Sequence, residues 1–222
     1  MGTGKDGLET FKYDDLFSSL TALRPVYHFF DLKESSIVLD YGCGSGWTSD
    51  PLAGKAKSVY AIDISERDID KLKETIRINS IKNLFPSVGD AEKLTFEDEY
   101  FDFVFGNAIL HHLHLDKALS EVSRILKKGG KAAFCEPYGH NPLLNLYRYI
   151  KDRYVDKITY IHRPLKCTDR DVFEKYFSNV RFIETGFTSD RISFLRTLEA
   201  KILEELPFTR KYASYVTILL EK

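Results

Sequence analysis

Short apolar runs alternate with stretches of helical periodicity between residues 36 and 136. The runs, rich in Val, Ile, Leu and Phe, predict five buried strands at residues 36–40, 58–62, 84–88, 101–105 and 131–135. Between them, residues 65–79 and 116–126 show the spacing of helices, and Ser65 followed by Asp68 favours a cap at the first helix. Strands and helices that alternate at this spacing predict right-handed β–α–β units and a parallel sheet covered by helices on both faces.

The flanking segments depart from this alternation. Apolar positions over residues 8–30 have helical spacing and predict one or two N-terminal helices. Residues 137–167 are rich in Tyr, His, Arg and Pro and are interpreted as an insertion after the fifth strand. The rest of the chain predicts a helix, a strand, a second helix and a last strand, at residues 169–177, 180–188, 194–203 and 212–220.

Composition narrows the class of protein. A chain of 222 residues with 43% hydrophobic and 29% charged residues is typical of one globular α/β domain. Its net charge of -1 gives no overall attraction to polyanions. Three widely spaced cysteines predict neither a disulfide framework nor a structural metal site. The first residues lack a signal-peptide pattern and no apolar run reaches membrane-spanning length, so a cytoplasmic location is expected.

Polar residues follow each of the five predicted strands. They are Asp40, Asp63, Asp90, Asn107 and Glu136. Asp and Asn are also common in turns and at helix caps, so any one of them has a purely structural explanation. Ligands of an open parallel sheet bind at the carboxyl ends of its strands, however, and five such residues on five successive strands indicate a binding site there.

A glycine-rich turn follows the first strand and opens a helix. Gly42, Gly44 and Gly46 allow a tight backbone and a close approach by a ligand, and the N–H groups at the helix start favour an anionic group. Trp47 replaces the last glycine of the dinucleotide pattern and would crowd a pyrophosphate. Asp63, 23 residues after Asp40, suits both hydroxyls of a ribose and repels a 2′-phosphate. NAD and S-adenosylmethionine therefore both remain.

The motifs taken together resemble those of class I S-adenosylmethionine-dependent methyltransferases. Residues 38–46 are similar to the first motif of that family and residues 61–65 to its acidic second motif. Residues 89–91, 101–105, 111–113 and 124–130 follow in the order and at the spacing of the later motifs. The resemblance covers residues 36–136. It implies a Rossmann-like, mostly parallel sheet of seven strands in the order 3-2-1-4-5-7-6, with strand 7 antiparallel.

The resemblance also implies roles for the residues at the strand ends. Asp40 and the three glycines form the turn that receives S-adenosylmethionine, and Asp63 binds its ribose. Ile64 and Ala91 contact the adenine, Asp90 accepts a hydrogen bond from the adenine amine, and Asn107 lies near the methionine end. The product would be S-adenosylhomocysteine.

The reaction would be an in-line displacement at the cofactor's methyl group, with a base if the acceptor atom carries a proton. Histidine suits this role because its pKa lies near neutrality. His111, His112 and His114 follow the fourth strand and His140 follows the fifth; His111 and His140 are the favoured candidates. Such histidines also pack or cap helices in many folds.

The acceptor is expected to be a small molecule, with its O, N or C atom undetermined. The chain lacks the Asn/Asp-Pro-Pro-Tyr turn typical of amide and adenine N-methylation, and Cys135 is interpreted as a core thiol rather than a nucleophile. Basic and aromatic residues in 148–170 also leave RNA as an alternative substrate. The residues expected at the acceptor are Tyr13, Phe17, Glu136, Tyr138 and Tyr147.

These interpretations define one domain over residues 1–222. It comprises an N-terminal helical cap (1–35), a cofactor-binding core (36–136), a substrate lid (137–167) and the C-terminal part of the sheet (168–222). Two other functions stay open: an NAD-dependent oxidoreductase on a similar fold, and a binding protein that has lost the chemistry. No metal is expected, and the oligomeric state stays open.

Overall fold

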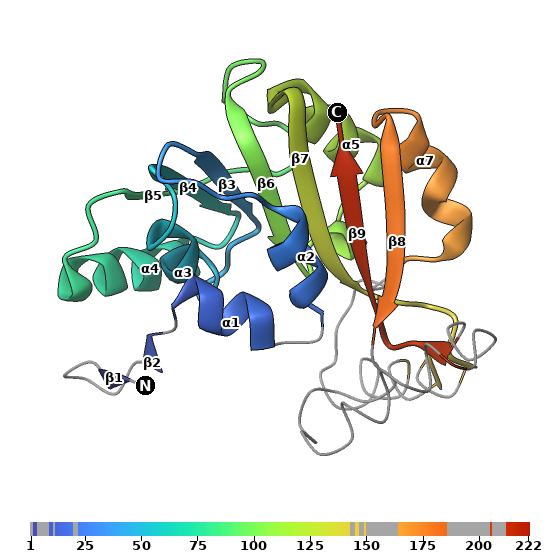
Figure 1. Cartoon of the computed structure of the whole chain (residues 1–222), viewed down its shortest axis with the longest axis horizontal. Coiled ribbons are helices and arrows are strands. Elements are labelled where there is room, and N and C mark those ends of the chain that lie inside the picture. Colours follow the sequence, from blue (N-terminus) through green and yellow to red (C-terminus); the bar gives the residue numbers. More distant parts are fainter. Residues whose placement is uncertain are drawn as a thin grey trace.

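The computed structural model describes most of the core and both ends of the chain (Figure 1). The described residues are 2–3, 9–10, 12–19, 22–142, 145–146, 149, 164–185, 205 and 212–222. Much of the segment 137–167, including Tyr147, and the whole predicted helix 194–203 lie outside them.

A seven-stranded sheet forms the centre of the molecule. Its strands are β3 (Ile37–Tyr41), β4 (Ser58–Asp63), β5 (Leu84–Val88), β6 (Phe101–Asn107), β7 (Leu126–Pro137), β8 (Asn179–Thr185) and β9 (Tyr215–Glu221). They lie in the order β5-β4-β3-β6-β7-β9-β8, and β9 is antiparallel to both of its neighbours. This is the predicted order 3-2-1-4-5-7-6 with an antiparallel strand 7, and the prediction is confirmed.

Helices cover both faces of this sheet, as the alternation predicts. One face packs against α1 (Tyr13–Ser19), α2 (Arg24–Phe29), α3 (Ser49–Ala53) and α4 (Glu66–Asn79); the other packs against α5 (Leu115–Ile125) and α7 (Arg170–Glu174). Neighbouring residues on a strand point to opposite faces of the sheet. Val38 therefore packs on the face that α1 to α4 cover, and Leu39 packs on the face that α5 and α7 cover. Figure 1 shows α2 on the near side of the sheet and α5 behind it.

Individual residues account for where these helices and strands begin. Helix α4 starts where Ser65 accepts a hydrogen bond from the Asp68 N–H (3.3 Å), as the capping pattern predicts, and buries Ile69 and Leu72. Strand β7 begins at Leu126, five residues before the predicted start. The reason is that Leu126 is fully buried and pairs with Phe101, after which the register shifts before Phe103 pairs with Lys131.

Two further differences lie in the segments that flank residues 36–136. The predicted helix 169–177 is a 3-10 turn (η3, Cys167–Asp169) followed by the short α7. The N-terminal segment adds a small antiparallel pair of strands, β1 (Gly2–Thr3) and β2 (Glu9–Thr10), which the helical spacing did not predict.

The parallel register brings the predicted site residues to one edge. Tyr41 lies beside Ile62 on β4 and beside Gly106 on β6, and Asn107 lies beside Cys135 on β7. The chain therefore leaves β3, β4, β6 and β7 at the same side of the sheet, where the glycine-rich turn also lies.

Candidate functional site

The glycine-rich turn after β3 depends on a left-handed backbone. Gly42, Gly44 and Gly46 all have positive φ angles, of 73°, 52° and 87°. A β-carbon at Gly46 would overlap the side chain of Leu72 on α4, so this glycine is required by packing. At Gly44 nothing lies within 4 Å of such a β-carbon. The backbone of Gly44 is thus accessible to a ligand on that side.

Asp63 at the end of β4 holds this turn in place. One carboxylate oxygen accepts from the Gly44 N–H (2.8 Å), and the other accepts from the Ser65 N–H (2.8 Å). A carboxylate offers about four acceptor positions, so two hydrogen bonds leave capacity for hydroxyl donors of a ligand. The geometry is compatible with a residue that both supports the turn and binds a ribose.

Asp40 lies behind the turn rather than beside it. Its side chain is buried, and one oxygen accepts from the hydroxyls of Thr48 (2.9 Å) and Ser49 (2.6 Å) at the start of α3. Burial raises the pKa of this carboxyl to about 6, against the opposing effect of the two hydroxyl donors. Asp40 thus supports the start of α3, and its part in the turn that receives the cofactor stays a prediction.

The residues after β4 and β5 present both apolar and polar groups. Ile64 is 78% exposed, more than any other large hydrophobic residue among those described, so its side chain is accessible to a flat apolar ligand. Ala91 is buried and its carbonyl accepts a hydrogen bond from the Tyr41 hydroxyl (2.6 Å). Asp90 accepts from the Glu92 N–H (2.8 Å), which closes a tight turn beside them.

A histidine–glutamate pair lies next to the end of β6. Asn107 ends that strand, Ala108 has a positive φ of 55°, and the 3-10 turn η1 (Leu110–His112) follows. Glu136 on β7 has no exposed surface. Its Oε2 lies 2.7 Å from Nδ1 of His111, and its Oε1 accepts from the N–H groups of Ile109 (2.9 Å) and Leu110 (2.8 Å). This argues against the predicted contact of Glu136 with an acceptor.

His140, the other favoured histidine, is held by the backbone instead. Its Nε2 accepts from the Cys167 N–H (2.9 Å), and its ring lies 4.7 Å from that of Tyr138. Tyr138 is itself buried, which raises the pKa of its hydroxyl to about 12. When Nε2 accepts a backbone N–H, its lone pair is occupied, and the other nitrogen of a neutral imidazole already carries the proton. His140 then has no free lone pair for an acceptor's proton, so His111 is the better candidate for the base.

The predicted acceptor residues of the N-terminal helix are buried. Tyr13 and Phe17 on α1 stack at 4.5 Å between ring centroids, and Phe17 contacts Phe105 on β6 edge-on. The Tyr13 hydroxyl is buried without a hydrogen-bond partner among the described residues. Phe17 is therefore a core residue, whereas Tyr13 carries a polar group that still requires a partner.

The thiol of Cys135 has no nucleophilic role in this arrangement. The side chain is 2% exposed and lies near the carbonyl of Ala22 and the hydroxyl of Thr217. Burial raises its pKa to about 12, so the thiol stays protonated near neutrality. The expectation of a core thiol agrees with this environment.

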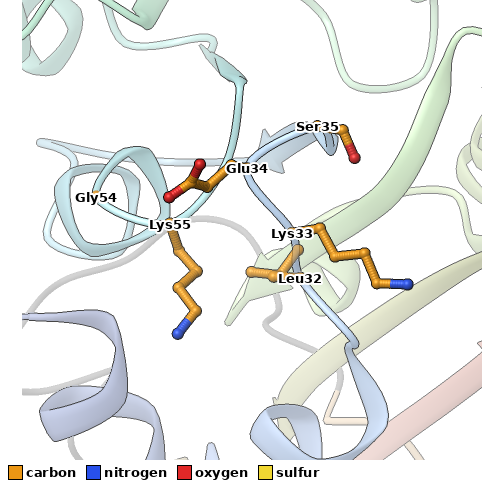
Figure 2. A pocket seen from close by; sticks show the side chains of 6 residues that line it. All are labelled: Leu32, Lys33, Glu34, Ser35, Gly54 and Lys55. Atoms are coloured by element: carbon orange, nitrogen blue, oxygen red, sulfur yellow. The ribbon is translucent and has the colours of Figure 1, made fainter.

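A hollow of about 590 Å³ lies away from these residues. Figure 2 shows it between the loop that precedes β3 and the end of α3. Its lining residues are Leu32, Lys33, Glu34, Ser35, Gly54 and Lys55. They lie at the amino ends of β3 and β4, so this hollow is separate from the candidate site. Within the described part of the chain no cluster of three or more His, Cys, Asp or Glu suits a metal.

Two contacts of the site were missed by reasoning from the sequence. One is the pair of His111 and Glu136, and the other is the hydrogen bond from Tyr41 to Ala91. Both join residues that are 25 or more positions apart. A buried acid at the end of a strand was the available signal for the first, because such an acid needs donors close by.

The comparisons with known proteins agree on one family. A family model described as a methyltransferase domain matches residues 39–134. The chain is 33% identical over 186 residues to the ubiquinone/menaquinone biosynthesis C-methyltransferase UbiE of Chromobacterium violaceum, covering 77% of this chain and 72% of that protein. It is 32% identical over 121 residues to the demethylmenaquinone methyltransferase of Thermobifida fusca, covering 54% of this chain and 51% of that protein.

The solved structures share the fold. Phosphoethanolamine N-methyltransferase 2 of Haemonchus contortus, in complex with S-adenosyl-L-methionine, has a TM-score of 0.68 at 21% identity and covers 90% of this chain and 52% of that one. The chain spans about half the length of the first curated relatives that it matches. Across the residues described, no helix has the length and apolar character of a membrane span.

Proposed function

The chain belongs to the class I S-adenosylmethionine-dependent methyltransferases, and we propose that it transfers the methyl group of S-adenosylmethionine to a small-molecule acceptor. We further propose an in-line displacement in which His111 removes the acceptor's proton. The observation that carries this proposal is the contact of His111 with the buried Glu136 beside the end of β6. Among the described residues no comparable carboxylate contact supports His140, whose Nε2 accepts from the backbone.

The residues around the glycine-rich turn fit the cofactor. The open side of Gly44 suits the close approach of a carboxylate, and the remaining acceptor positions of Asp63 suit the ribose hydroxyls. The exposed Ile64 and the buried Ala91 suit the two faces of an adenine, with Asp90 toward its amine. Asn107, at the end of β6, is proposed for the methionine end.

The chemistry needs few groups from the protein. When bound beside Gly44 and Asp63, the cofactor would supply a methyl carbon on a sulfonium, which is activated for transfer to a nucleophilic atom of the acceptor. The protein orients the acceptor and keeps water out. His111 takes the proton that the acceptor atom loses, a step that contributes roughly 10²–10⁴-fold in comparable enzymes.

A small molecule is favoured over RNA as the acceptor. The net charge is -1, and the relatives include quinone and phosphoethanolamine methyltransferases. An acceptor carbon or nitrogen that carries hydrogen must lose a proton on methylation, which gives His111 a task. The cap over residues 1–35 and the lid over 137–167 stay proposals for the walls of the acceptor site.

Separate experiments test the proposed cofactor and the proposed class of acceptor. Calorimetry should show S-adenosylhomocysteine binding and no NAD binding; the reverse would indicate an oxidoreductase. Transfer of a labelled methyl group would then be measured to a reduced demethylmenaquinone analogue, phosphoethanolamine and sarcosine. With the best acceptor, His111→Gln should lower kcat at least ~100-fold while cofactor affinity stays unchanged. Full turnover by His111→Gln would remove His111 as the base.

A further inference from the structure

Glu136 is too deeply buried to meet a substrate, yet it contacts the proposed base. We propose that Glu136 is a positioning residue that sets the tautomer of His111, with the proton on Nδ1 and the lone pair on Nε2. The inference rests on the proposed role of His111 and assigns to Glu136 the task of keeping that base in its accepting form.

The carboxylate of Glu136 is fixed on every side that the structure describes. Its strand, β7, lies between β6 and β9, and Glu136 itself pairs with Val216. Oε1 accepts the two N–H groups of Ile109 and Leu110, so the carboxylate cannot rotate without losing both bonds. Oε2 is thereby held 2.7 Å from Nδ1 of His111. Nδ1 of His111 therefore meets a carboxylate oxygen in a fixed direction.

That partner determines where the imidazole carries its proton. An ionised carboxylate can only accept hydrogen bonds, so Nδ1 of His111 must be the donor. In a neutral imidazole the other nitrogen, Nε2, then holds the lone pair that can accept a proton. The same pairing stabilises the imidazolium once the proton has been taken, as a carboxylate beside a histidine does in hydrolytic triads.

The substitution Glu136→Gln keeps the size of the side chain almost unchanged but reverses the direction of its hydrogen bond with His111. The amides of Ile109 and Leu110 require an oxygen at the position of Oε1, so the NH₂ group of glutamine must take the position of Oε2. It then donates toward Nδ1, which must become an acceptor, and the proton moves to Nε2. The turn η1 keeps both of its backbone bonds, whereas the base loses its accepting lone pair.

Nuclear magnetic resonance of the full chain with S-adenosylhomocysteine tests this without an acceptor. The ¹⁵N shifts of His111, assigned with His111→Gln, should report Nδ1–H in the wild type and Nε2–H in Glu136→Gln. Finding Nε2–H in the wild type would overturn the proposal, and this measurement needs no folded variant of Glu136. An unchanged tautomer in Glu136→Gln would overturn it too.

Kinetics with the acceptor selected above provide the second test. Glu136→Gln should lower kcat roughly 100-fold or more with KM nearly unchanged, and should add less than about twofold in a His111→Gln background. An equal loss in both backgrounds would mean that Glu136 acts only on structure, and the inference fails. If His111→Gln alone keeps full turnover, the proposed base is wrong, while the ¹⁵N shifts still decide the tautomer.

Discussion

At the scale of single residues, Gly44 differs from the other glycines of its turn. Its φ of 52° is left-handed, but a β-carbon there meets nothing within 4 Å. Gly44→Ala should therefore cost only about 1 kcal/mol of stability for the backbone conformation. Affinity for S-adenosylhomocysteine should fall about tenfold or more, equal to ~1.4 kcal/mol, because the methyl group occupies the side that the cofactor approaches. Calorimetry and urea unfolding measure the two effects.

Gly129 provides a matched control for this prediction. It too has a positive φ, of 72°, and free space for a β-carbon, but it lies at the amino end of the β7 pairing with β6. Gly129→Ala should cost similar stability and leave cofactor affinity unchanged. If the two alanine variants bind S-adenosylhomocysteine equally well, the backbone of Gly44 is not part of the site.

Asp40 makes stability depend on pH. Its folded pKa of about 6 lies above the ordinary value of 3.8, so the folded state holds the proton longer than the unfolded state does. Stability therefore falls as pH rises from about 4 to 6 and is constant above that range. The unfolding free energy of Asp40→Asn minus that of the wild type should rise over the same window, by up to about 3 kcal/mol.

Urea unfolding at several pH values measures that difference. Ser49→Ala should shift the pKa of Asp40 further upward, because it removes a hydroxyl donor that lowers this pKa. In that variant the loss of stability should extend to higher pH. A difference between Asp40→Asn and the wild type that is flat from pH 4 to 8 would contradict a buried, protonatable Asp40.

At the scale of elements, one arginine ties α5 to the loop before β6. The Arg124 guanidinium donates to the carbonyls of Phe96 (2.7 Å) and Leu94 (3.1 Å) and to the carboxylates of Asp98 and Glu121. Arg124→Ala should lower the free energy of unfolding by about 1–3 kcal/mol, because these partly buried carbonyls lose a charged donor. Arg124→Lys should lose less of the unfolding free energy than Arg124→Ala but should not restore the wild-type value, because one ammonium cannot reach every acceptor.

An exposed ion pair on α4 shows what a surface arginine contributes. Arg77 pairs with Glu74, and both side chains are mostly exposed. Arg77→Ala should cost at most ~0.5 kcal/mol in the same urea experiment. Equal losses for the alanine variants of Arg77 and Arg124 would mean that the contacts with the loop carbonyls contribute nothing.

The elements also show what the sequence could and could not predict. Periodicity placed β5 at residues 84–88 and the cap of α4 at Ser65, because both depend on neighbouring residues. It misplaced the start of β7, where pairing of Leu126 with Phe101 extends the strand through two glycines. Spacing did not identify the hydrogen-bond partners of Asp40 and Glu136, because these depend on which donors the folded chain brings to each buried carboxylate.

At the scale of the whole molecule, cofactor binding should stabilise the fold. A ligand at 100 times its Kd adds about 2.7 kcal/mol to the free energy of unfolding. S-adenosylhomocysteine should therefore raise Tm, and NAD should not. Asp63→Ala should weaken cofactor binding by ~1–3 kcal/mol and so reduce the rise in Tm at a fixed ligand concentration. A full rise in that variant would argue against Asp63 as the ribose residue.

The antiparallel β9 has a consequence for how the protein is made. The outermost strand β8 reaches the sheet only through β9, which pairs with β7 on its other side. On the ribosome, β3 to β7 emerge early and can join, but β8 must wait until residues 215–221 have been synthesised. Until then β7 is a bare apolar edge, the kind of surface that chaperones recognise. We expect the growing chain to depend on such help until β9 has joined the sheet.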